Sequence, residues 1–215
     1  MGRTANGKDD LAGIRRLYDR EAARYDRIQE GRFMRWLLRG RREKAAQYAR
    51  GRLLEVGIGS GTTLALYQSE VQVTGIDIST GMLAIARTRL EQLGRDGDLR
   101  EMDAQALDFP DHSFDSVALN LCLCTIPEPA RALREAIRVA KAGAPMTFLE
   151  HVRSDRMWVA LPQDLLNVFS GSLHDRLNQR TEALVRAAGV EVLSVERWAL
   201  GAMTLIIGRS PVRQP

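Results

Sequence analysis

The chain has 215 residues and a net charge of +4, and its 45% hydrophobic and 27% charged residues are ordinary for a globular protein. This length suits one domain with a full core, and no apolar run approaches the roughly 20 residues needed to span a bilayer. The polar first ten residues differ from a secretory signal peptide.

Basic residues are concentrated at the front of the chain. Residues 1–52 carry 15 Lys or Arg against 7 Asp or Glu, a net charge of +8, whereas the remaining residues carry 16 against 20, a net charge of −4. The cationic side chains alternate with large apolar ones and do not cluster with stacking aromatics, so no nucleic-acid partner is expected. An anionic membrane surface is the better match.

Two helical stretches are predicted before the first strand, after ten residues that are expected to be disordered. Apolar residues have helical spacing over 11–25, and a second stretch covers 28–48, with breaks or bends at Gly31 and Gly40. Within the second stretch, arginines surround Trp36 and its apolar neighbours, a composition typical of a helix at a membrane interface. Packing of this stretch on the sheet is the alternative.

Strands and helices then alternate, which indicates a parallel sheet with helices on both faces. The predicted strands are 52–56, 72–77, 99–103, 116–122, 145–151, 191–198 and 203–208. The predicted helices are 61–67, 82–93 (capped by Ser79 or Thr80), 130–140 and 178–188, with an irregular segment over 153–175. The short turn between the last two strands predicts an antiparallel hairpin at the sheet edge.

A glycine-rich turn follows the first strand. Between Leu53 and Gly61 an apolar run ends in Glu55 and three alternating glycines, and the next apolar run ends in Asp77. Strand, turn, helix and strand in this order leave the backbone open to a nucleoside ligand.

The details of this turn indicate which nucleoside it binds. A dinucleotide fingerprint needs a last small residue at position 62, which is Thr62, and a pyrophosphate needs a helix N-terminus without a carboxylate such as Glu55 nearby. A cationic amino-acid tail with a sulfonium needs the opposite, a fixed negative charge beside a close backbone. The turn therefore predicts S-adenosylmethionine (SAM) as the cofactor and disfavours a nicotinamide-dependent oxidoreductase.

The segment from Glu55 to Gly61, together with Asp77, resembles motif I and the following acid of class I SAM-dependent methyltransferases. The resemblance runs over about residues 18–209. It implies an α/β, Rossmann-like fold, with a seven-stranded, mostly parallel sheet, helices on both faces and an antiparallel C-terminal strand. Residues 1–50 are expected to form an N-terminal helical lid that also contacts a membrane, and residues 51–215 the SAM-binding methyltransferase domain.

The resemblance also implies a set of cofactor contacts. Asp77 lies 20 residues after Gly57, where a carboxylate can accept both ribose hydroxyls. Ile78 and Met82 correspond to an apolar slot around the adenine, and Asp103 and Ala104 to the motif that reads the adenine edge. Asn120 corresponds to the motif near the methionine end of SAM, and Tyr25 to a tyrosine on a helix folded over the cofactor. The predicted cofactor-binding residues are Tyr25, Glu55, Gly57, Gly59, Gly61, Asp77, Ile78, Met82, Asp103, Ala104 and Asn120.

His151 is the predicted catalytic residue, because it ends a strand on the acceptor side and an imidazole can take the proton released on methyl transfer. A structural histidine is the alternative, and His174 is a weaker candidate. Alignment alone can supply roughly 7–11 kcal/mol of the barrier, so a catalytic triad is not required. No metal is expected, because Cys122 and Cys124 lack a second pair of ligands and fit a packing role.

The sequence thus predicts a SAM-dependent methyltransferase that releases S-adenosylhomocysteine and acts on N, S or O of a small lipophilic acceptor. A phospholipid headgroup amine at a membrane surface is one substrate class, and a small-molecule thiol or a quinone is the alternative. A nicotinamide-dependent oxidoreductase and a non-catalytic membrane-binding module are alternatives of another kind. The expected location is cytoplasmic, peripheral on the inner face of the membrane through the basic N-terminal helices.

Overall fold

The computed structural model describes residues 7–154, 156–158, 160–161 and 180–212. Its N-terminal part is helical, with α1 at Gly7–Gln29, α2 at Arg32–Leu37 and α3 at Arg41–Ala46. The predicted breaks are confirmed, because Gly31 precedes α2 and Gly40, with φ +75°, precedes α3. Of the ten residues predicted to be disordered, the last four begin α1 and the others lie outside the described residues.

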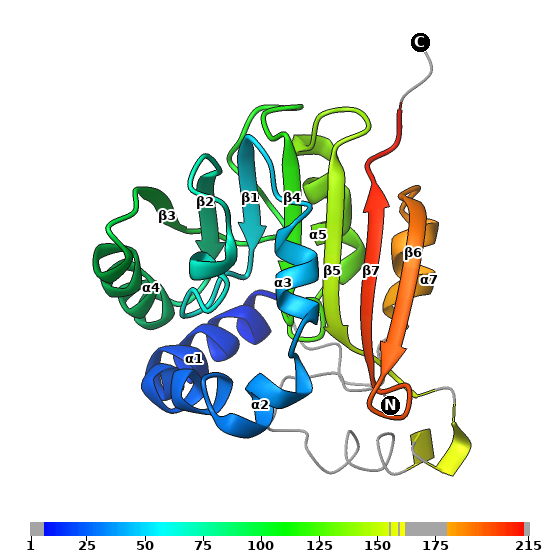
Figure 1. The fold of residues 1–215 in the computed structure, drawn as a ribbon, viewed down its shortest axis with the longest axis horizontal. Helices are drawn as coiled ribbons and strands as arrows, with labels where there is room; N and C mark the ends of the chain where they lie inside the picture. Colours follow the sequence, from blue (N-terminus) through cyan, green and yellow to red (C-terminus); the bar gives the residue numbers. More distant parts are fainter. Residues whose placement is uncertain (1–6, 155, 159, 162–179, 213–215) are drawn as a thin grey trace.

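The seven-stranded sheet is confirmed, in the order β3-β2-β1-β4-β5-β7-β6 (Figure 1). Its strands are β1 (Arg52–Val56), β2 (Gln72–Asp77), β3 (Gly97–Glu101), β4 (Ser116–Asn120), β5 (Pro145–His151), β6 (Glu191–Trp198) and β7 (Met203–Arg209). The strands β1 to β5 pair in parallel, and β7 lies antiparallel between β5 and β6. The strand order reverses between β1 and β4, which is where ligands bind in open α/β sheets.

Helices cover both faces of the sheet, as predicted. They are α4 (Thr80–Leu93), α5 (Pro129–Val139) and α7 (Thr181–Ala187), in addition to the three N-terminal helices. In Figure 1, α3 lies in front of the sheet, whereas α5 and α7 lie behind it. Successive side chains of a strand point to opposite faces of the sheet, so each strand contributes to a core layer on either face.

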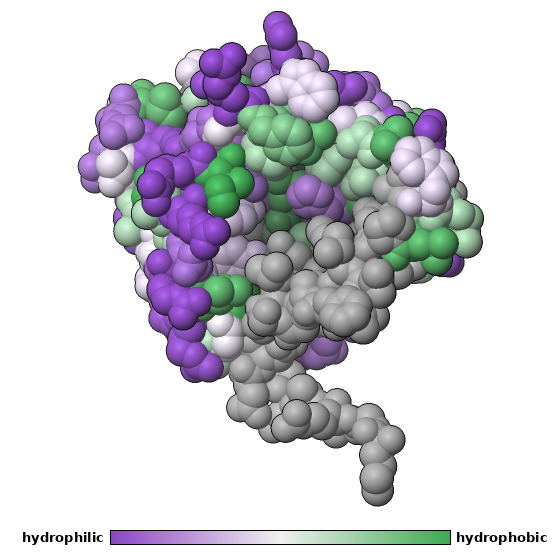
Figure 2. All heavy atoms as spheres, turned by 90° about the horizontal axis from the view of Figure 1, so that it is seen from below, coloured by the Kyte–Doolittle hydropathy of each residue, from purple (hydrophilic) through white to green (hydrophobic). Residues whose placement is uncertain are grey.

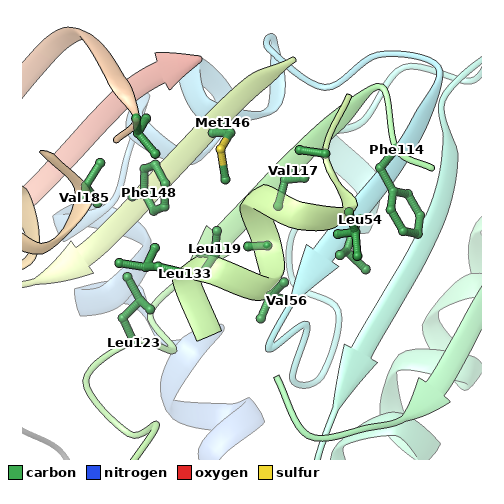
Figure 3. Packing of buried hydrophobic residues seen from close by; sticks show 14 of the residues in the cluster. Leu54, Val56, Phe114, Val117, Leu119, Leu123, Leu133, Met146, Phe148 and Val185 are labelled. Carbon is green, nitrogen blue, oxygen red and sulfur yellow. The ribbon is translucent and has the colours of Figure 1, made fainter. Parts of the chain in front are cut away.

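The two core layers are built from neighbouring residues of the same strands. Behind the sheet, Leu54 and Phe148 pack with Leu133 of α5, and all three are at most 1% exposed (Figure 3). In front, Leu53 of β1 packs with Leu83 of α4. Burying a large apolar side chain contributes about 1.5–3 kcal/mol, so these layers fix the sheet and with it the carboxyl ends of its strands.

The helix predicted over 61–67 is wrong. The chain forms only the short 3-10 turn η1 at Leu64–Leu66. The Thr63 hydroxyl donates to the buried Glu55 carboxylate at 2.7 Å, and threonine side chains that bond in this way compete with helix formation. A β-branched pair, Thr62 and Thr63, adds to the effect by disfavouring helix.

Several elements differ from their predicted bounds, β3, β4 and α7 among them. β3 covers Gly97–Glu101 in place of 99–103, and β4 ends at Asn120 because Leu121 takes a left-handed conformation with φ +55°. α7 covers Thr181–Ala187, and the start of the helix predicted over 178–188 lies outside the described residues, as does most of the irregular segment 153–175.

Helix α1 is fastened to α4 by polar contacts. The Asp19 Oδ1 atom accepts hydrogen bonds from Ser79 Oγ at 2.7 Å and from the Gly81 backbone N–H at 3.0 Å, at the N-terminus of α4. Further along α1, Asp26 Oδ1 lies 3.1 Å from Arg89 Nη2. A Cβ atom at Gly81 would lie 3.0 Å from the Asp19 carbonyl oxygen, so the glycine permits this close approach. Helices α1 and α2 lie at the carboxyl ends of the parallel strands (Figure 1).

Candidate functional site

A cavity lies at the carboxyl ends of β1, β2 and β4, under α1. Ten of the eleven predicted cofactor residues line it, and they come from α1, from the ends of β1, β2 and β4, from the segments after β1, β2 and β3, and from α4. These ten are Tyr25, Glu55, Gly57, Gly59, Asp77, Ile78, Met82, Asp103, Ala104 and Asn120. Residues dispersed over about a hundred positions of sequence therefore meet in one place.

The three glycines after β1 have positive φ angles but different surroundings. A Cβ atom at Gly57 would lie 2.4 Å from Cys122 Cβ, whereas at Gly59 it would meet nothing within 4 Å. At Gly61 it would lie 2.5 Å from Leu64 Cδ1, so this glycine faces the core and does not line the cavity. A cofactor contact by Gly61 stays a prediction.

Asp77 connects the two turns that form the floor of the cavity. Its Oδ2 atom accepts a hydrogen bond from Gly59 N at 2.9 Å, and its Oδ1 atom accepts one from Ser79 N at 2.9 Å. Burial raises the pKa of Asp77 to about 6, against the opposing effect of these backbone N–H groups. A carboxylate has about four lone-pair sites, so Asp77 retains capacity to accept a ligand hydroxyl. Ser79 also caps α4 by accepting from Met82 N, as predicted.

Glu55 forms a second buried acidic centre. It is 1% exposed, and its carboxylate accepts hydrogen bonds from Thr63 Oγ1 at 2.7 Å and Asn120 Nδ2 at 2.9 Å. Burial raises the pKa of Glu55, and these hydrogen bonds oppose that shift. The Oδ1 atom of Asn120 is buried and has no hydrogen-bond partner in the described part of the chain. A carboxylate beside a vacant carbonyl acceptor fits the cationic amine of SAM.

The far wall of the cavity is a tight loop after β4. Leu121, Cys122, Thr125, Ile126 and Pro127 line the cavity from this side. Glu150 of β5 is fully buried, and its Oε1 atom accepts hydrogen bonds from the backbone N–H groups of Cys122 and Leu123, each at 3.1 Å. This contact holds the loop against the sheet although Leu121 has an unfavourable backbone conformation.

Both cysteines belong to this loop and are buried. Burial, with the nearby Glu150 carboxylate, raises the pKa of the Cys122 thiol well above its ordinary value. A protonated thiol is a poor nucleophile, which favours packing over a reactive role. In the described residues, no group of three or more His, Cys, Asp or Glu is placed to hold a metal ion.

His151 lies apart from these residues. It is the last residue of β5, its register partner is Met203 of β7, and it does not line the cavity. Its role as a base stays a prediction, and His174 lies outside the described residues.

Sequence reasoning missed several residues that line the cavity, of which Arg42 and Thr63 carry the most chemistry. Arg42, from α3, donates from Nη2 to Gln29 Oε1 at 2.6 Å. Burial lowers the pKa of Arg42, and nearby Glu30 and Tyr25 oppose that shift. Nothing in the sequence separates Arg42 from the other arginines at the front of the chain, whereas Thr63 could have been found from its place directly after the glycine turn.

Comparisons with known proteins agree with this geometry. The family described as "Methyltransferase domain" matches residues 54–148. The chain is 42% identical over 136 residues to the phosphatidylethanolamine N-methyltransferase of Cereibacter sphaeroides, covering 62% of this chain and 67% of that protein. This chain belongs to the class I SAM-dependent methyltransferases. It is therefore a SAM-dependent enzyme, and the oxidoreductase alternative is set aside.

The names of other relatives of this methyltransferase refer to quinone methylation. The chain is 34% identical over 142 residues to the demethylmenaquinone methyltransferase of Thermus thermophilus, covering 62% of this chain and 64% of that protein. The matched stretches span from 40% to 67% of the length of the curated relatives. A SAM-dependent methyltransferase from Methanosarcina mazei has the same fold, with a TM-score of 0.65 at 21% identity, covering 78% of this chain and 96% of that one.

The glycine turn generates a first prediction. Gly57→Ala should lower the free energy of unfolding by at least about 2 kcal/mol, because the new methyl group overlaps Cys122 and the backbone is left-handed. Gly59→Ala meets no atoms and should cost about 1–2 kcal/mol from its backbone alone, yet it should weaken SAM binding because its methyl group enters ligand space. Urea unfolding and SAM titration of both variants measure these effects, and equal unfolding losses would contradict this account.

Asp77 generates a second prediction. Because its pKa is raised to about 6, the carboxylate gains a proton as the pH falls through that value and loses charge and acceptor capacity. SAM should therefore bind about fivefold to tenfold more weakly at pH 5 than at pH 7.5, as measured by calorimetry. Asp77→Asn should bind SAM weakly at both pH values. If the variant keeps the pH dependence of the parent protein, the titrating group is another acid of the cavity, such as Glu55.

Proposed function

We propose that this methyltransferase moves the methyl group of SAM to the amine of a phospholipid headgroup and releases S-adenosylhomocysteine. The observation that carries the proposal is that the cavity lies behind a face of the molecule that exposes aromatic, apolar and basic side chains. A relative at 42% identity is named phosphatidylethanolamine N-methyltransferase, which supports the same substrate class.

The nucleoside half of the cofactor fits one end of the cavity. Asp77, at the end of β2, would accept the ribose hydroxyls, and Ile78 and Met82 would enclose the adenine ring. Asp103 would accept the exocyclic amine of the adenine, with the backbone of Ala104 beside the ring edge. This assignment places the ring among apolar groups and the hydroxyls beside a carboxylate.

The amino-acid half fits the other end. Glu55 and Asn120 would hold the ammonium group, and Gly59 leaves room for the tail to pass close to the backbone. Tyr18 and Tyr25 of α1 line the same cavity, with their ring centroids 5.6 Å apart. Aromatic faces stabilise sulfonium and ammonium cations, so this pair suits both the methyl donor and a methylated amine.

Bound SAM supplies an activated methyl group on a sulfonium leaving group. SAM held by these residues would supply its methyl group to the acceptor nitrogen by in-line displacement, and the electron pair of the broken carbon–sulfur bond would stay on sulfur. The nitrogen would then lose its proton to solvent, because His151 does not line the cavity. The protein's main contribution is alignment, because the carboxylates and the rigid loop after β4 hold the reactants in one orientation.

The proposed membrane contact is the face at the carboxyl ends of the strands. On α2, Phe33 is 67% and Trp36 69% exposed. Exposed apolar residues of the segment at 156–158 and 160–161 and of the β6–β7 turn add to this face, namely Met157, Trp158, Leu161 and Leu200. α2, this segment and the turn all lie at the lower side of Figure 1, and Figure 2 shows the same side hollowed, with apolar side chains on the rim.

The charges beside this face fit an anionic membrane. Arg32, Arg35 and Arg39 are exposed on or directly after α2, and amphipathic surfaces of this composition bind anionic lipid. No helix among the described residues is long and apolar enough to cross a bilayer. We therefore propose peripheral attachment, on the cytoplasmic leaflet, with the cavity turned toward the lipid headgroups.

A quinone is the second candidate acceptor. Relatives at 31–36% identity are named demethylmenaquinone methyltransferase, and the wall formed by Leu121, Ile126 and Pro127 is apolar enough for a ring. A quinone also partitions into membranes, so the exposed face does not separate the two acceptors.

Product analysis separates them. The purified protein is incubated with methyl-labelled SAM and anionic vesicles that contain phosphatidylethanolamine, demethylmenaquinone and a long-chain thiol, and the labelled products are separated. We expect the label in the lipid headgroup, and none with Asp77→Ala. Label only in the quinone or only in the thiol would overturn the proposed acceptor and leave the methyltransferase assignment intact.

The membrane face generates its own prediction. Phe33→Ser and Trp36→Ser should each weaken binding to anionic vesicles at least about tenfold, because each removes a large apolar group that would enter the interface. Cosedimentation measures the binding, and SAM affinity should stay unchanged. Leu193→Ser, on β6 and 47% exposed, is the matched control and should bind as the parent protein does. Equal vesicle binding by all three variants would contradict the proposal that this face binds the membrane.

A further inference from the structure

One cationic side chain lines a cavity whose other charged side chains are acidic. Glu55, Asp77 and Asp103 contribute carboxylates, and Arg42 is the only Lys or Arg among the described residues of the lining. Arg42 comes from α3, outside the segment matched by the methyltransferase family. Its presence requires an explanation, because removing a charged group from water is costly unless it gains a partner.

The described contacts of Arg42 leave most of its hydrogen-bonding capacity unused. A guanidinium has five N–H donors, and the one described hydrogen bond runs from Nη2 to the neutral amide oxygen of Gln29 at 2.6 Å. No carboxylate among the described residues lies within ion-pair distance of Arg42, although Glu30 and Glu55 are near enough to raise its pKa. Gln29 is 6% exposed and itself lines the cavity, so this bond fixes the guanidinium at the cavity wall.

The placement of opposite charges matches an α-amino acid. Glu55 and the vacant Oδ1 atom of Asn120 offer acceptors for an ammonium group, and Arg42 offers donors for a carboxylate in the same cavity. Arginine binds carboxylates and phosphates in a bidentate manner, and its fork is already oriented here by Gln29.

We propose that Arg42 binds an oxyanion in the cavity, and that this oxyanion is the carboxylate of the amino-acid tail of SAM. The inference rests on the proposed roles of Glu55 and Asn120 at the amine. Because Gln29 ends α1 and Arg42 belongs to α3, the N-terminal helices then supply a cofactor ligand and do more than cover the site. A lipid phosphate has the same chemistry and is the rival source of the oxyanion.

A ligand that lacks the carboxylate tests this proposal. Decarboxylated SAM keeps the sulfonium, the nucleoside and the amine. Calorimetry with both ligands should show that Arg42→Gln weakens SAM binding at least about tenfold but changes the affinity for decarboxylated SAM less than about twofold. Arg42→Lys should recover part of the loss, because it restores the charge but not the bidentate geometry.

Arg134→Gln is the matched control, because Arg134 of α5 is exposed and does not line the cavity, and it should leave both affinities unchanged. Equal losses for the two ligands in Arg42→Gln would show a purely structural role and overturn the proposal. Unchanged SAM affinity with a raised KM for phosphatidylethanolamine would assign the oxyanion to the lipid phosphate instead. Because the SAM-binding measurement uses no methyl acceptor, its result tests the role of Arg42 independently of the proposed lipid substrate.

Discussion

The carboxylate of Asp77 is the contact on which the site depends. It accepts the backbone N–H of Gly59 in the turn after β1 and that of Ser79 in the turn after β2, both at 2.9 Å. One side chain thus fixes the spacing between two turns that belong to different strands. Burial of this acid is unfavourable for its charge, and the two N–H groups offset part of that cost while keeping the cavity floor polar.

Periodicity predicted the strands and most helices well, because the two core layers follow the alternation of side chains along each strand. Periodicity failed where a tertiary contact determines the local backbone conformation. The helix expected at 61–67 is replaced by a 3-10 turn, since Thr63 bonds to Glu55, a residue that local propensity does not consider. Likewise β4 stops at Asn120, because Leu121 takes a left-handed conformation with φ +55° and Glu150 of β5 holds the loop that follows through the N–H groups of Cys122 and Leu123.

The site could be predicted to the extent that it rests on local motifs. Asp77 ends β2 and Gly59 lies in the turn after β1, and both can be recognised from their spacing. Arg42 cannot, because its approach to the cavity depends on how α3 packs against the sheet, which no short pattern encodes. Gly61 and Gly59 belong to the same glycine-rich motif, but the absence of a side chain at Gly61 makes room for Leu64. The sequence alone does not separate a glycine required by core packing from one required by ligand space.

The fastening of α1 to α4 links the cover of the cavity to its floor. Ser79 donates its backbone N–H to Asp77 and its hydroxyl to Asp19 of α1, so one residue serves both. If α1 lifts, the N-terminus of α4 loses an acceptor next to the carboxylate that forms the floor. By linkage, a ligand that strengthens this contact would be bound more tightly, by the same factor, when α1 is in place.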